Sequence, residues 1–380
     1  MIRSYTLPTL LLVSFGLAAQ TPAPKPFLSH QVNADHTLTF RMLAPTAKSL
    51  SVSIDAFPKP LPMERDENGV WSVTTPVLPP EYYGYSFNLD GHTILDPLNS
   101  HVRPSLTSGT DVILVPGTPP APWELAAIPH GAVTQHVYTT HAAINLPAGQ
   151  ESYVVYTPPG YDARKKGGYP VLYLLHGWSD DQSGWTAVGH ANDIMDSLID
   201  SGKAVPMIVV MPLGYGDYDF VTHGSGVWHD KAKVDANTAS FTAMLTGEIM
   251  PAIEREYNVA AGRDNRAIIG LSMGGLESLS IGLTHTADFA WVGGMSAAIQ
   301  NDDFDQLTGG LAPARANLRL LWVACGTGDG LINPNRAFIE AAKAKGLPVT
   351  AVETPGAHTW LVWRDNLLHF APLLFKGGEK

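Results

Sequence analysis

Short apolar runs with two different spacings divide the chain into two regions. From about Gln31 to Pro116, runs such as HTLTFRML, SLSVSID, GVWSVTT and YYGYSFNLDG alternate apolar with polar residues or are rich in β-formers. Pro, Asn and Gly separate these runs, and no helical pattern interrupts them. Several short strands at this spacing are typical of two packed antiparallel sheets. The pattern therefore predicts a small all-β, immunoglobulin-like sandwich over residues 30–116.

A second pattern begins after a proline-rich stretch, PGTPPAPWEL, which predicts a linker at residues 117–129. Between residues 130 and 380, apolar runs of strand length alternate with helical stretches. The expected strands are SYVVYT, PVLYLLH, MIVVMP, RAIIGL, WVGGMS, LLWVAC and PVTAVET, and the expected helices are HANDIMDSLIDSG, FTAMLTGEIMPAIEREY, NRAFIEAAKAKG and LVWRDNLLHFAPLLF. This alternation predicts an α/β domain with a mostly parallel sheet. Pro251 inside a helical pattern predicts a kink or a new helix start.

Composition and charge narrow the classes of partner. The chain has 380 residues, of which 45% are hydrophobic, so it can bury a sizeable core in two domains. A formal net charge of -11 argues against nucleic acid or an anionic membrane surface as a partner. Cys325 is the single cysteine, which excludes an internal disulfide. No Cys/His cluster has zinc spacing, and we expect neither a metal nor an organic cofactor. The oligomeric state stays open.

The first residues have the pattern of a secretory signal. Arg3 precedes the apolar run LPTLLLVSFGLAA, which ends in small residues and is too short to span a bilayer comfortably. We expect a signal peptide over residues 1–19, cleaved near Ala19, and a proline-rich tail over residues 20–29. A secreted or periplasmic protein without membrane attachment after cleavage would result. The alternative is a buried or unstructured N-terminal segment.

The stretch RAIIGLSMGGL contains the strongest candidate for a nucleophile. Ser272 lies between an apolar run of strand length and a pattern of helical spacing, and Gly270 and Gly274 flank it as G-x-S-x-G. This is the signature of a nucleophile elbow, a sharp turn between a strand and a helix. Because such a short pattern also arises by chance, a serine in an ordinary glycine-rich loop is the alternative. The order of the other catalytic groups along the chain decides between them.

An acid and a histidine follow Ser272 in the order that α/β-hydrolases require. Asp329 lies in a glycine-rich loop directly after the strand that ends at Cys325. His358 lies between the last expected strand and the final helix. His358 would accept the Ser272 proton, and Asp329 would orient and stabilise the imidazolium. Rival acids in the loop QNDDFDQ are ranked lower: Asp302, Asp303 and Asp305.

Two backbone N–H groups are expected to form the oxyanion hole. One is that of Met273, directly after the nucleophile, and the other that of Trp178 in the loop YLLHGWSDDQSGW. Aromatic residues in the expected strand-end loops either line an acyl pocket or pack the loops: Trp185, Tyr215, Trp228 and Trp360. All residues assigned to chemistry lie after Glu151.

Several motifs of the second region resemble those of carbohydrate esterase family 1 and the enterochelin esterases, which include feruloyl and acetylxylan esterases. They are YTPPGYD, YPVLYLLHGWSDDQSGW, EIMPAIEREYNV, NRAIIGLSMGG, CGTGDG and HTWLVWRDNLLHFAPLLF, and they span residues 130–377 in the expected order. The resemblance implies an α/β-hydrolase fold with Ser272, Asp329 and His358 as the triad. Many relatives have glycine where Trp178 stands, and a bulky side chain there narrows the acyl site.

The resemblance also implies a carboxylic ester as substrate, carried by a small molecule or a polysaccharide. A feruloyl or acetyl ester on plant polysaccharide is favoured. A siderophore ester, acyl transfer and a non-catalytic carbohydrate-binding protein are the alternatives. The first region resembles the family 48 carbohydrate-binding modules in LTFRMLAPTAKSLSVSID, PMERDENGVWSVTTPVLPPEYYGYSFNLDG and ILDPLNS. It has DAFPKP where that family carries a Phe-Asn pair, which favours a scaffold role.

Overall fold

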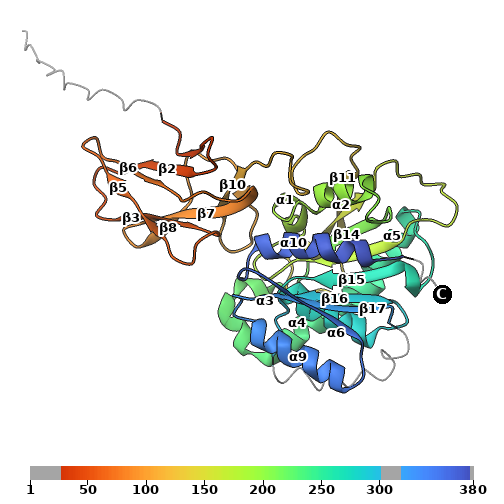
Figure 1. Cartoon of the computed structure of the whole chain (residues 1–380). Helices are drawn as coiled ribbons and strands as arrows, with labels where there is room; N and C mark the ends of the chain where they lie inside the picture. Colours follow the sequence, from red (N-terminus) through yellow and green to blue (C-terminus); the bar gives the residue numbers. More distant parts are fainter. Residues whose placement is uncertain (1–26, 301–317, 377–380) are drawn as a thin grey trace, which may run out of the picture.

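The computed structural model describes residues 27–300 and 318–376, which fold into a β-sandwich followed by a larger α/β domain (Figure 1). The expected signal peptide and most of the proline-rich tail lie outside the described residues, as do Asp302, Asp303 and Asp305. The described strands up to Val115 belong to the sandwich, and those from Ala132 onward belong to the α/β domain.

The sandwich consists of two antiparallel sheets. One has the order β1 (His30–Val32), β2 (Leu38–Leu43), β6 (Val70–Thr74) and β5 (Glu64–Arg65). The other has the order β4 (Leu61–Pro62), β3 (Leu50–Ile54), β7 (Glu81–Leu89), β10 (Thr110–Val115) and β9 (Val102–Arg103), with β8 (His92–Ile94) beside β7. Alternate residues of β7, such as Tyr83, Tyr85 and Phe87, point into the core between the sheets. The alternation in the sequence thus produces the two-layer domain.

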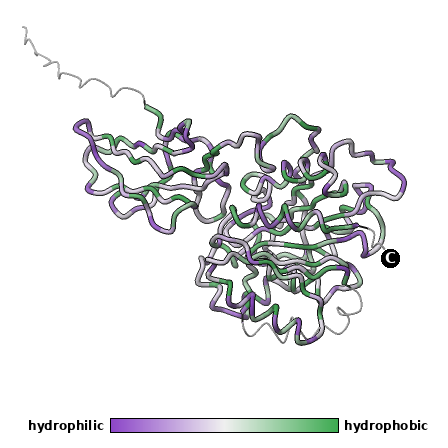
Figure 2. The backbone as a smooth tube through the Cα atoms, viewed as in Figure 1, coloured by the Kyte–Doolittle hydropathy of each residue, from purple (hydrophilic) through white to green (hydrophobic). Residues whose placement is uncertain are grey.

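One mixed sheet of eight strands forms the centre of the α/β domain. Its order is β11 (Ala132–Thr139), β12 (Gln150–Thr157), β14 (Ile208–Pro212), β13 (Val171–Leu175), β15 (Arg266–Gly270), β16 (Trp291–Met295), β17 (Leu320–Gly326) and β18 (Val349–Thr354). The pairs of β12 with β11 and with β14 are antiparallel, and the remaining neighbours are parallel. The central strands are buried on both faces, which explains their continuous apolar sequences (Figure 2).

Helices cover both faces of this sheet. The first face packs against α1 (Gly184–Ala187), α2 (Ala191–Asp200) and α10 (Trp360–Phe370). The second packs against α4 (Lys231–Met244), α5 (Met250–Glu256), α6 (Met273–Thr284) and α9 (Ile332–Ala344), and also against the short α3 (Asp219–Thr222). Short turns complete the domain: η1 (Pro147–Gly149), η2 (Ser225–His229), η4 (Arg263–Asn265) and η5 (Ala371–Leu373). This arrangement confirms the predicted α/β-hydrolase architecture.

The helix that contains Pro251 adapts to it by a change of pitch. A π-helical turn, η3 (Leu245–Ile249), joins α4 to α5, and Pro251 follows at the second residue of α5. Proline lacks an N–H and its ring collides with the carbonyl of the preceding turn of an α-helix. A wider turn at this point relieves the collision. The predicted new helix start therefore corresponds to Met250, within a helical segment that continues from Lys231.

The sandwich lies against the strand-end loops of the α/β domain rather than apart from it (Figure 1). Tyr82 of β7 stacks on His190 with ring centroids 3.9 Å apart. Leu361 of α10 packs against the apolar core of the sandwich. Both contacts join the sandwich to elements that border the carboxyl ends of the parallel strands, where α/β proteins place their ligand sites.

Candidate active site

Ser272 lies at a sharp turn between β15 and α6. Its backbone has φ 53° and ψ -112°, a conformation that is strained for a residue with a side chain. The Ser272 N–H donates to the carbonyl of Met295 over 2.9 Å, which holds the turn against the neighbouring strand β16. The turn presents the serine hydroxyl at the carboxyl edge of the sheet, the position of a nucleophile elbow.

The glycines that flank Ser272 are required by close backbone contacts. A Cβ atom on Gly270 would lie 2.4 Å from the carbonyl carbon and oxygen of Gly274. A Cβ atom on Gly274 would lie 2.5 Å from the carbonyl oxygen of His176. Both distances are shorter than van der Waals contact permits, so any side chain at these positions would force the elbow open. The G-x-S-x-G spacing therefore has a steric cause in this fold.

The structure brings Ser272, His358 and Asp329 together from three separate loops. His358 lies between β18 and α10, and its Nε2 is 3.1 Å from the Ser272 hydroxyl oxygen. Its Nδ1 is 2.8 Å from Oδ2 of Asp329, which lies between β17 and α9. In the neutral tautomer that fits these contacts, Nδ1–H donates to the carboxylate and Nε2 accepts from the hydroxyl. The side chains are thus in hydrogen-bond reach in the order that nucleophilic catalysis requires.

Asp329 is buried and held in its ionised form. Burial alone would raise its pKa, but the hydrogen bond and charge of His358, together with the N–H of Leu331, lower the pKa below its usual value. The Leu331 N–H donates to the second carboxylate oxygen, Oδ1, over 2.8 Å. The edge of the Trp363 ring packs against the His358 ring with centroids 4.9 Å apart. The imidazole is therefore oriented by a carboxylate on one side and an indole on another.

The two backbone groups proposed for the oxyanion hole lie beside Ser272. Met273 is the first residue of α6, whose N–H groups point toward the helix start. The loop of Trp178 approaches closely, because a Cβ on Gly177 would lie 3.3 Å from the Cβ of Ser272. Within the described part of the chain, neither the Met273 nor the Trp178 N–H donates to another protein group. Both are therefore available to an oxygen bound next to the serine.

A pocket of about 190 Å³ opens above Ser272 and His358. Its walls include the indoles of Trp178, Trp360 and Trp363 from the α/β domain. Asp55 and Arg103 of the sandwich complete the wall, so the pocket lies between the two domains. The sequence did not assign these two residues to the site: Asp55 begins the DAFPKP segment, which was considered only for carbohydrate binding, and nothing in the local pattern distinguishes Arg103 from other surface charges. Both residues precede Glu151, so the pocket wall begins earlier in the chain than the residues assigned to chemistry.

The predicted aromatic lining needs correction. Trp185 and Tyr215 have no exposed surface and do not line this pocket. The Trp185 indole donates to the carbonyl of Leu175, and Tyr215 packs in the core below the pocket. Trp228 packs edge-on against Phe220 with centroids 5.0 Å apart and is also absent from the lining. Of the four predicted residues, Trp360 alone is among the described residues that line the pocket.

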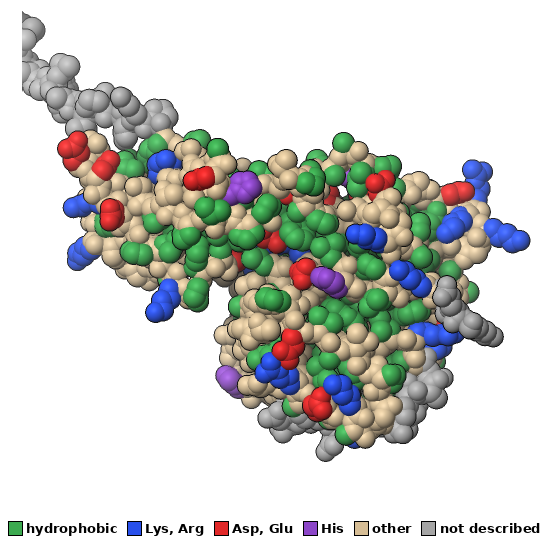
Figure 3. All heavy atoms as spheres, in the orientation of Figure 1, with side chains coloured by type: hydrophobic (Ala, Val, Ile, Leu, Met, Phe, Trp, Pro, Cys, Tyr) green, Lys and Arg blue, Asp and Glu red, His purple; other side chains and the backbone are tan. Residues whose placement is uncertain are grey.

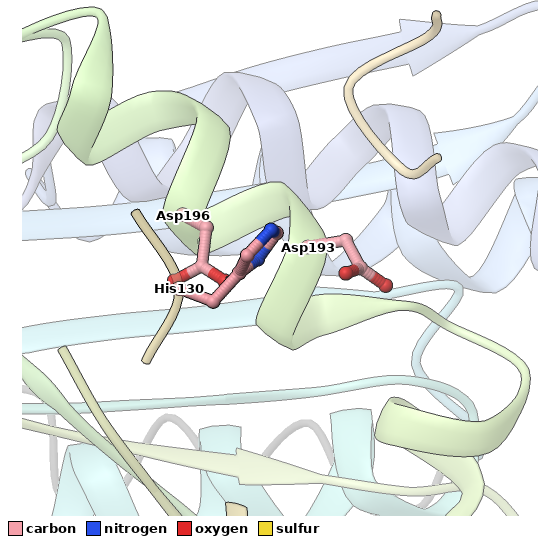
Figure 4. A group of neighbouring side chains, drawn as sticks. All are labelled: His130, Asp193 and Asp196. Carbon is pink, nitrogen blue, oxygen red and sulfur yellow. The ribbon is translucent and has the colours of Figure 1, made fainter. Parts of the chain in front are cut away.

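Only one group of side chains in the described residues has the composition of a metal site: His130, Asp193 and Asp196 (Figure 4). Its contacts indicate a different role. His130 lies 2.9 Å from both the Asp196 carboxylate and the Ala126 carbonyl, so both ring nitrogens have protein partners. The Gly131 N–H and the Tyr156 hydroxyl also donate to Asp196. These hydrogen bonds attach the end of the linker, at His130 and Gly131, to Asp196 of α2.

The surface gives no sign of a nucleic-acid site on the face shown in Figure 3, where acidic and basic side chains are interspersed. Among the described helices, none combines the length and the apolar character needed to cross a bilayer.

Residues 149–373 match the Esterase family, described as "Putative esterase". The chain belongs to this family, which places it among the ester hydrolases. It is 31% identical over 358 residues to the endo-1,4-beta-xylanase/feruloyl esterase of Xylanibacter ruminicola, covering 91% of this chain. The match spans 46% of that relative, so the chain corresponds to about half its length. The esterase resemblance read from the motifs is confirmed.

Two solved structures share the fold. The enterobactin esterase of Shigella flexneri superposes with a TM-score of 0.67 at 18% identity, covering 90% of this chain and 94% of that chain. A CE1 ferulic acid esterase from Anaeromyces mucronatus superposes with a TM-score of 0.56 at 22% identity, covering 66% of this chain and 93% of that chain. At these identities the likeness concerns the fold. The resemblance of the sandwich to carbohydrate-binding modules stays a prediction.

Proposed function

We propose that this protein is a serine esterase that hydrolyses feruloyl or acetyl esters on plant polysaccharide. The observation that carries the proposal is the contact chain from the Ser272 hydroxyl through His358 to the buried Asp329. Serine is a weak nucleophile until a base accepts its proton, and the base works only when it is correctly oriented. The three side chains meet both conditions in this structure.

The reaction proceeds in two displacements. In the first, Ser272 Oγ attacks the ester carbonyl carbon while His358 Nε2 accepts the hydroxyl proton. The Met273 and Trp178 N–H groups stabilise the negative charge that develops on the carbonyl oxygen. The tetrahedral intermediate then collapses, and His358 returns the proton to the departing alcohol. A water molecule then attacks the acyl-serine while His358 accepts its proton, and His358 returns that proton to Ser272 Oγ as the C–O bond breaks and the carboxylic acid leaves.

The choice of substrate class rests on the pocket walls and on one relative. The residues that line the pocket beside the reactive hydroxyl include Trp178, Trp360 and Trp363; Trp178 is the most exposed of the three, and an indole at this wall suits a planar aromatic acyl group. The relative from Xylanibacter ruminicola is named a feruloyl esterase as well as a xylanase. An acetyl group fits the same position with fewer contacts. On this basis we rank feruloyl esters first and acetyl esters second.

A siderophore ester is an alternative substrate to these polysaccharide esters, since the fold likeness to the enterobactin esterase covers 90% of this chain. Acyl transfer to another alcohol uses the same acyl-enzyme and differs only in the acceptor. Assays with methyl ferulate, acetylated xylan and a cyclic siderophore ester separate the hydrolytic candidates, with Ser272→Ala as the control for each substrate. Comparable turnover of the siderophore ester and none of methyl ferulate would overturn the substrate assignment. Added alcohol acceptors test for transfer.

We also propose that the protein acts outside the cytoplasm, secreted or in the periplasm, on the pattern of residues 1–19. N-terminal sequencing of protein recovered from the medium or periplasm is expected to begin near Gln20. An intact N-terminus in a cytoplasmic fraction would contradict this location.

A further inference from the structure

The loop that carries the Trp178 N–H is held in an unfavourable conformation. Ser179, the next residue, has φ 76°, which is left-handed backbone and uncommon for serine. The loop also packs closely on the elbow, since a Cβ atom on Gly177 would lie 2.6 Å from Cδ1 of Leu271 and 3.3 Å from the Cβ of Ser272. A strained loop persists only where its surroundings fix it. The contacts that fix this loop therefore decide whether the Trp178 N–H points toward the reacting oxygen.

Part of this support comes from within the α/β domain. The Tyr215 hydroxyl, which is fully buried, accepts from the Ser179 N–H over 2.8 Å. The Trp178 indole N–H donates to the carbonyl of Phe220 over 2.9 Å. These contacts hold one side of the loop. Neither contact involves the Asp180 carboxylate or the Ser179 carbonyl, which lie on the opposite side of the loop.

The sandwich supplies that second side. Arg103, at the end of β9, directs Nε to Asp180 Oδ1 at 3.1 Å, and its terminal Nη2 donates to the same oxygen. The Leu106 N–H donates to the Ser179 carbonyl over 2.8 Å, and the Ser105 hydroxyl donates to it over 3.0 Å. One short segment of the sandwich thus engages two consecutive residues of the loop.

The Arg103–Asp180 pair is the strongest of these contacts. The Asp180 side chain is only 2% exposed, and it lies almost 80 residues along the chain from Arg103. Burial raises the pKa of the Asp180 carboxyl, while the Arg103 charge and hydrogen bonds lower it. Removing the guanidinium would leave a buried carboxylate without its cation, which is strongly unfavourable. The loop would then move or take up a proton.

Arg103 also contacts the opposite wall of the pocket. Its guanidinium carbon lies 5.8 Å from the centre of the Trp360 ring. Trp360 begins α10, two residues after His358. Arg103, Asp180 and Trp360 all line the same pocket as Ser272. Arg103 therefore joins the loop on the oxyanion side of the pocket to the segment that follows the histidine.

We propose that Arg103 is a positioning residue for ester hydrolysis and that the sandwich, through Arg103, completes the active site by holding residues 177–180 in place. The inference rests on the proposed function, because it assigns the loop to oxyanion stabilisation. It also assigns the sandwich a role in the chemical step itself. A domain that only increased the local concentration of a polymer would have no effect on a small soluble ester.

The test is the kinetics of Arg103→Ala on a small chromogenic acetate ester, in the full chain. An oxyanion donor acts mainly on the transition state, and loss of one costs about 10²- to 10³-fold in kcat. For a displaced donor we expect kcat to fall about 10- to 100-fold, with KM changed less than about threefold. The matched control is Arg65→Ala, since Arg65 is also a sandwich arginine, 5.8 Å from the Trp71 ring and outside the pocket lining. Its kcat is expected to stay within about twofold of wild type.

Two further measurements separate positioning from a general loss of structure. Added guanidinium ion is expected to restore part of the Arg103→Ala activity, and to have no such effect on Arg65→Ala. Arg103→Lys is expected to have intermediate activity, because lysine keeps the charge but not the two-pronged geometry. If Arg103→Ala does not fold, the same test is made with Arg103→Lys and Ser105→Ala, for which a reduced kcat is expected.

The outcomes distinguish the inference from the proposed function. A wild-type enzyme without activity on any ester would overturn the proposed function. An active wild type with unchanged kcat in Arg103→Ala, Arg103→Lys and Ser105→Ala would overturn this inference alone. A change confined to KM would also overturn it, because it would show that Arg103 binds the ground state. Loss of kcat with rescue by guanidinium supports it.

Discussion

Arg364 of α10 reaches Glu81 of β7, with 3.0 Å between Nε and the carboxylate oxygen Oε1. The arginine side chain is completely buried between the two domains. Its other two nitrogens donate to the carbonyls of Val188 and Tyr82, each over 2.6 Å. Because α10 begins two residues after His358, this ion pair fixes the segment that follows the histidine to the sandwich.

Removing one partner of this pair is expected to destabilise the protein strongly. Arg364→Met leaves the buried Glu81 carboxylate without its cation, and the expected loss is about 3–5 kcal/mol of unfolding free energy. Urea denaturation followed by tryptophan fluorescence measures it. The exposed pair Arg336–Glu353 provides the control, and Arg336→Met is expected to cost less than about 1 kcal/mol. Equal losses of unfolding free energy in the two variants would show that the buried interdomain pair contributes no more to stability than an exposed pair.

The catalytic assignment predicts a large and specific loss of turnover. Ser272→Ala is expected to lower kcat about 10⁴-fold or more while the protein stays folded, because the members of a triad act as a unit. Asp329→Asn is expected to lower it about 10³- to 10⁴-fold through the wrong histidine tautomer. Asp303→Asn, the rival acid, is expected to change it less than about threefold. A reversed ranking of the two aspartates would assign the acid to the other loop.

The elbow glycines predict a steric effect that differs from loss of a functional group. A methyl group on Gly274 would collide with the His176 carbonyl, whereas one on Gly226 meets no atom within 4 Å. Gly274→Ala is therefore expected to cost about 1–3 kcal/mol of stability and most of the activity. Gly226→Ala is expected to leave both nearly unchanged. Thermal unfolding and ester hydrolysis measure the two effects, and a fully active Gly274→Ala variant would contradict the steric argument.

Secondary-structure elements were predicted correctly from the sequence where a local pattern of apolar residues identifies them. The apolar runs of the α/β domain correspond to strands β12 to β18, and the central ones, such as β13 and β14, are apolar throughout because they are buried on both faces. Most of α4 was missed, since its first residues, KAKVDANTAS, include too few apolar side chains to show helical spacing. Strand β11 is at the sheet edge with mostly exposed side chains, so it also lacks a clear pattern.

The residues of the candidate site also fall into those that a local pattern predicts and those that depend on distant contacts. Ser272, Asp329 and His358 were predicted because each follows a recognisable strand in a fixed order along the chain. Arg103 was not, because its role depends on a partner, Asp180, far away in sequence and on how the domains pack. For Trp185 the loop position left pocket lining and loop packing open, and in the structure its indole is buried in the core. Order along the chain thus predicts which side chains the structure brings together better than it predicts the pocket walls around them.

Glu151 on β12 is a buried carboxyl outside the pocket lining. It is 3% exposed, and in the described residues its Oε1 has no hydrogen-bond partner. Its Oε2 accepts from the Ser152 N–H over 3.0 Å. Burial raises the pKa of Glu151 to about 8, an effect that the Ser152 N–H reduces and the nearby charge of Glu248 increases. Among residues 27–300 and 318–376, no basic side chain contributes to this shift.

The raised pKa of Glu151 predicts the sign of a pH effect on stability. Between its usual value of 4.5 and about 8, the folded state keeps a proton that the unfolded state releases. The contribution of Glu151 to the unfolding free energy therefore falls as pH rises through this window, by up to about 1.4 kcal/mol per pH unit. Glu151→Gln, which stays neutral, is expected to be more stable than wild type at pH 8 and to differ little near pH 5. Urea denaturation at both pH values measures this difference, with the exposed Glu340→Gln as the control. A Glu151→Gln variant that is less stable at pH 8 than at pH 5, relative to wild type, would show that the carboxylate is ionised and stabilised in the folded protein.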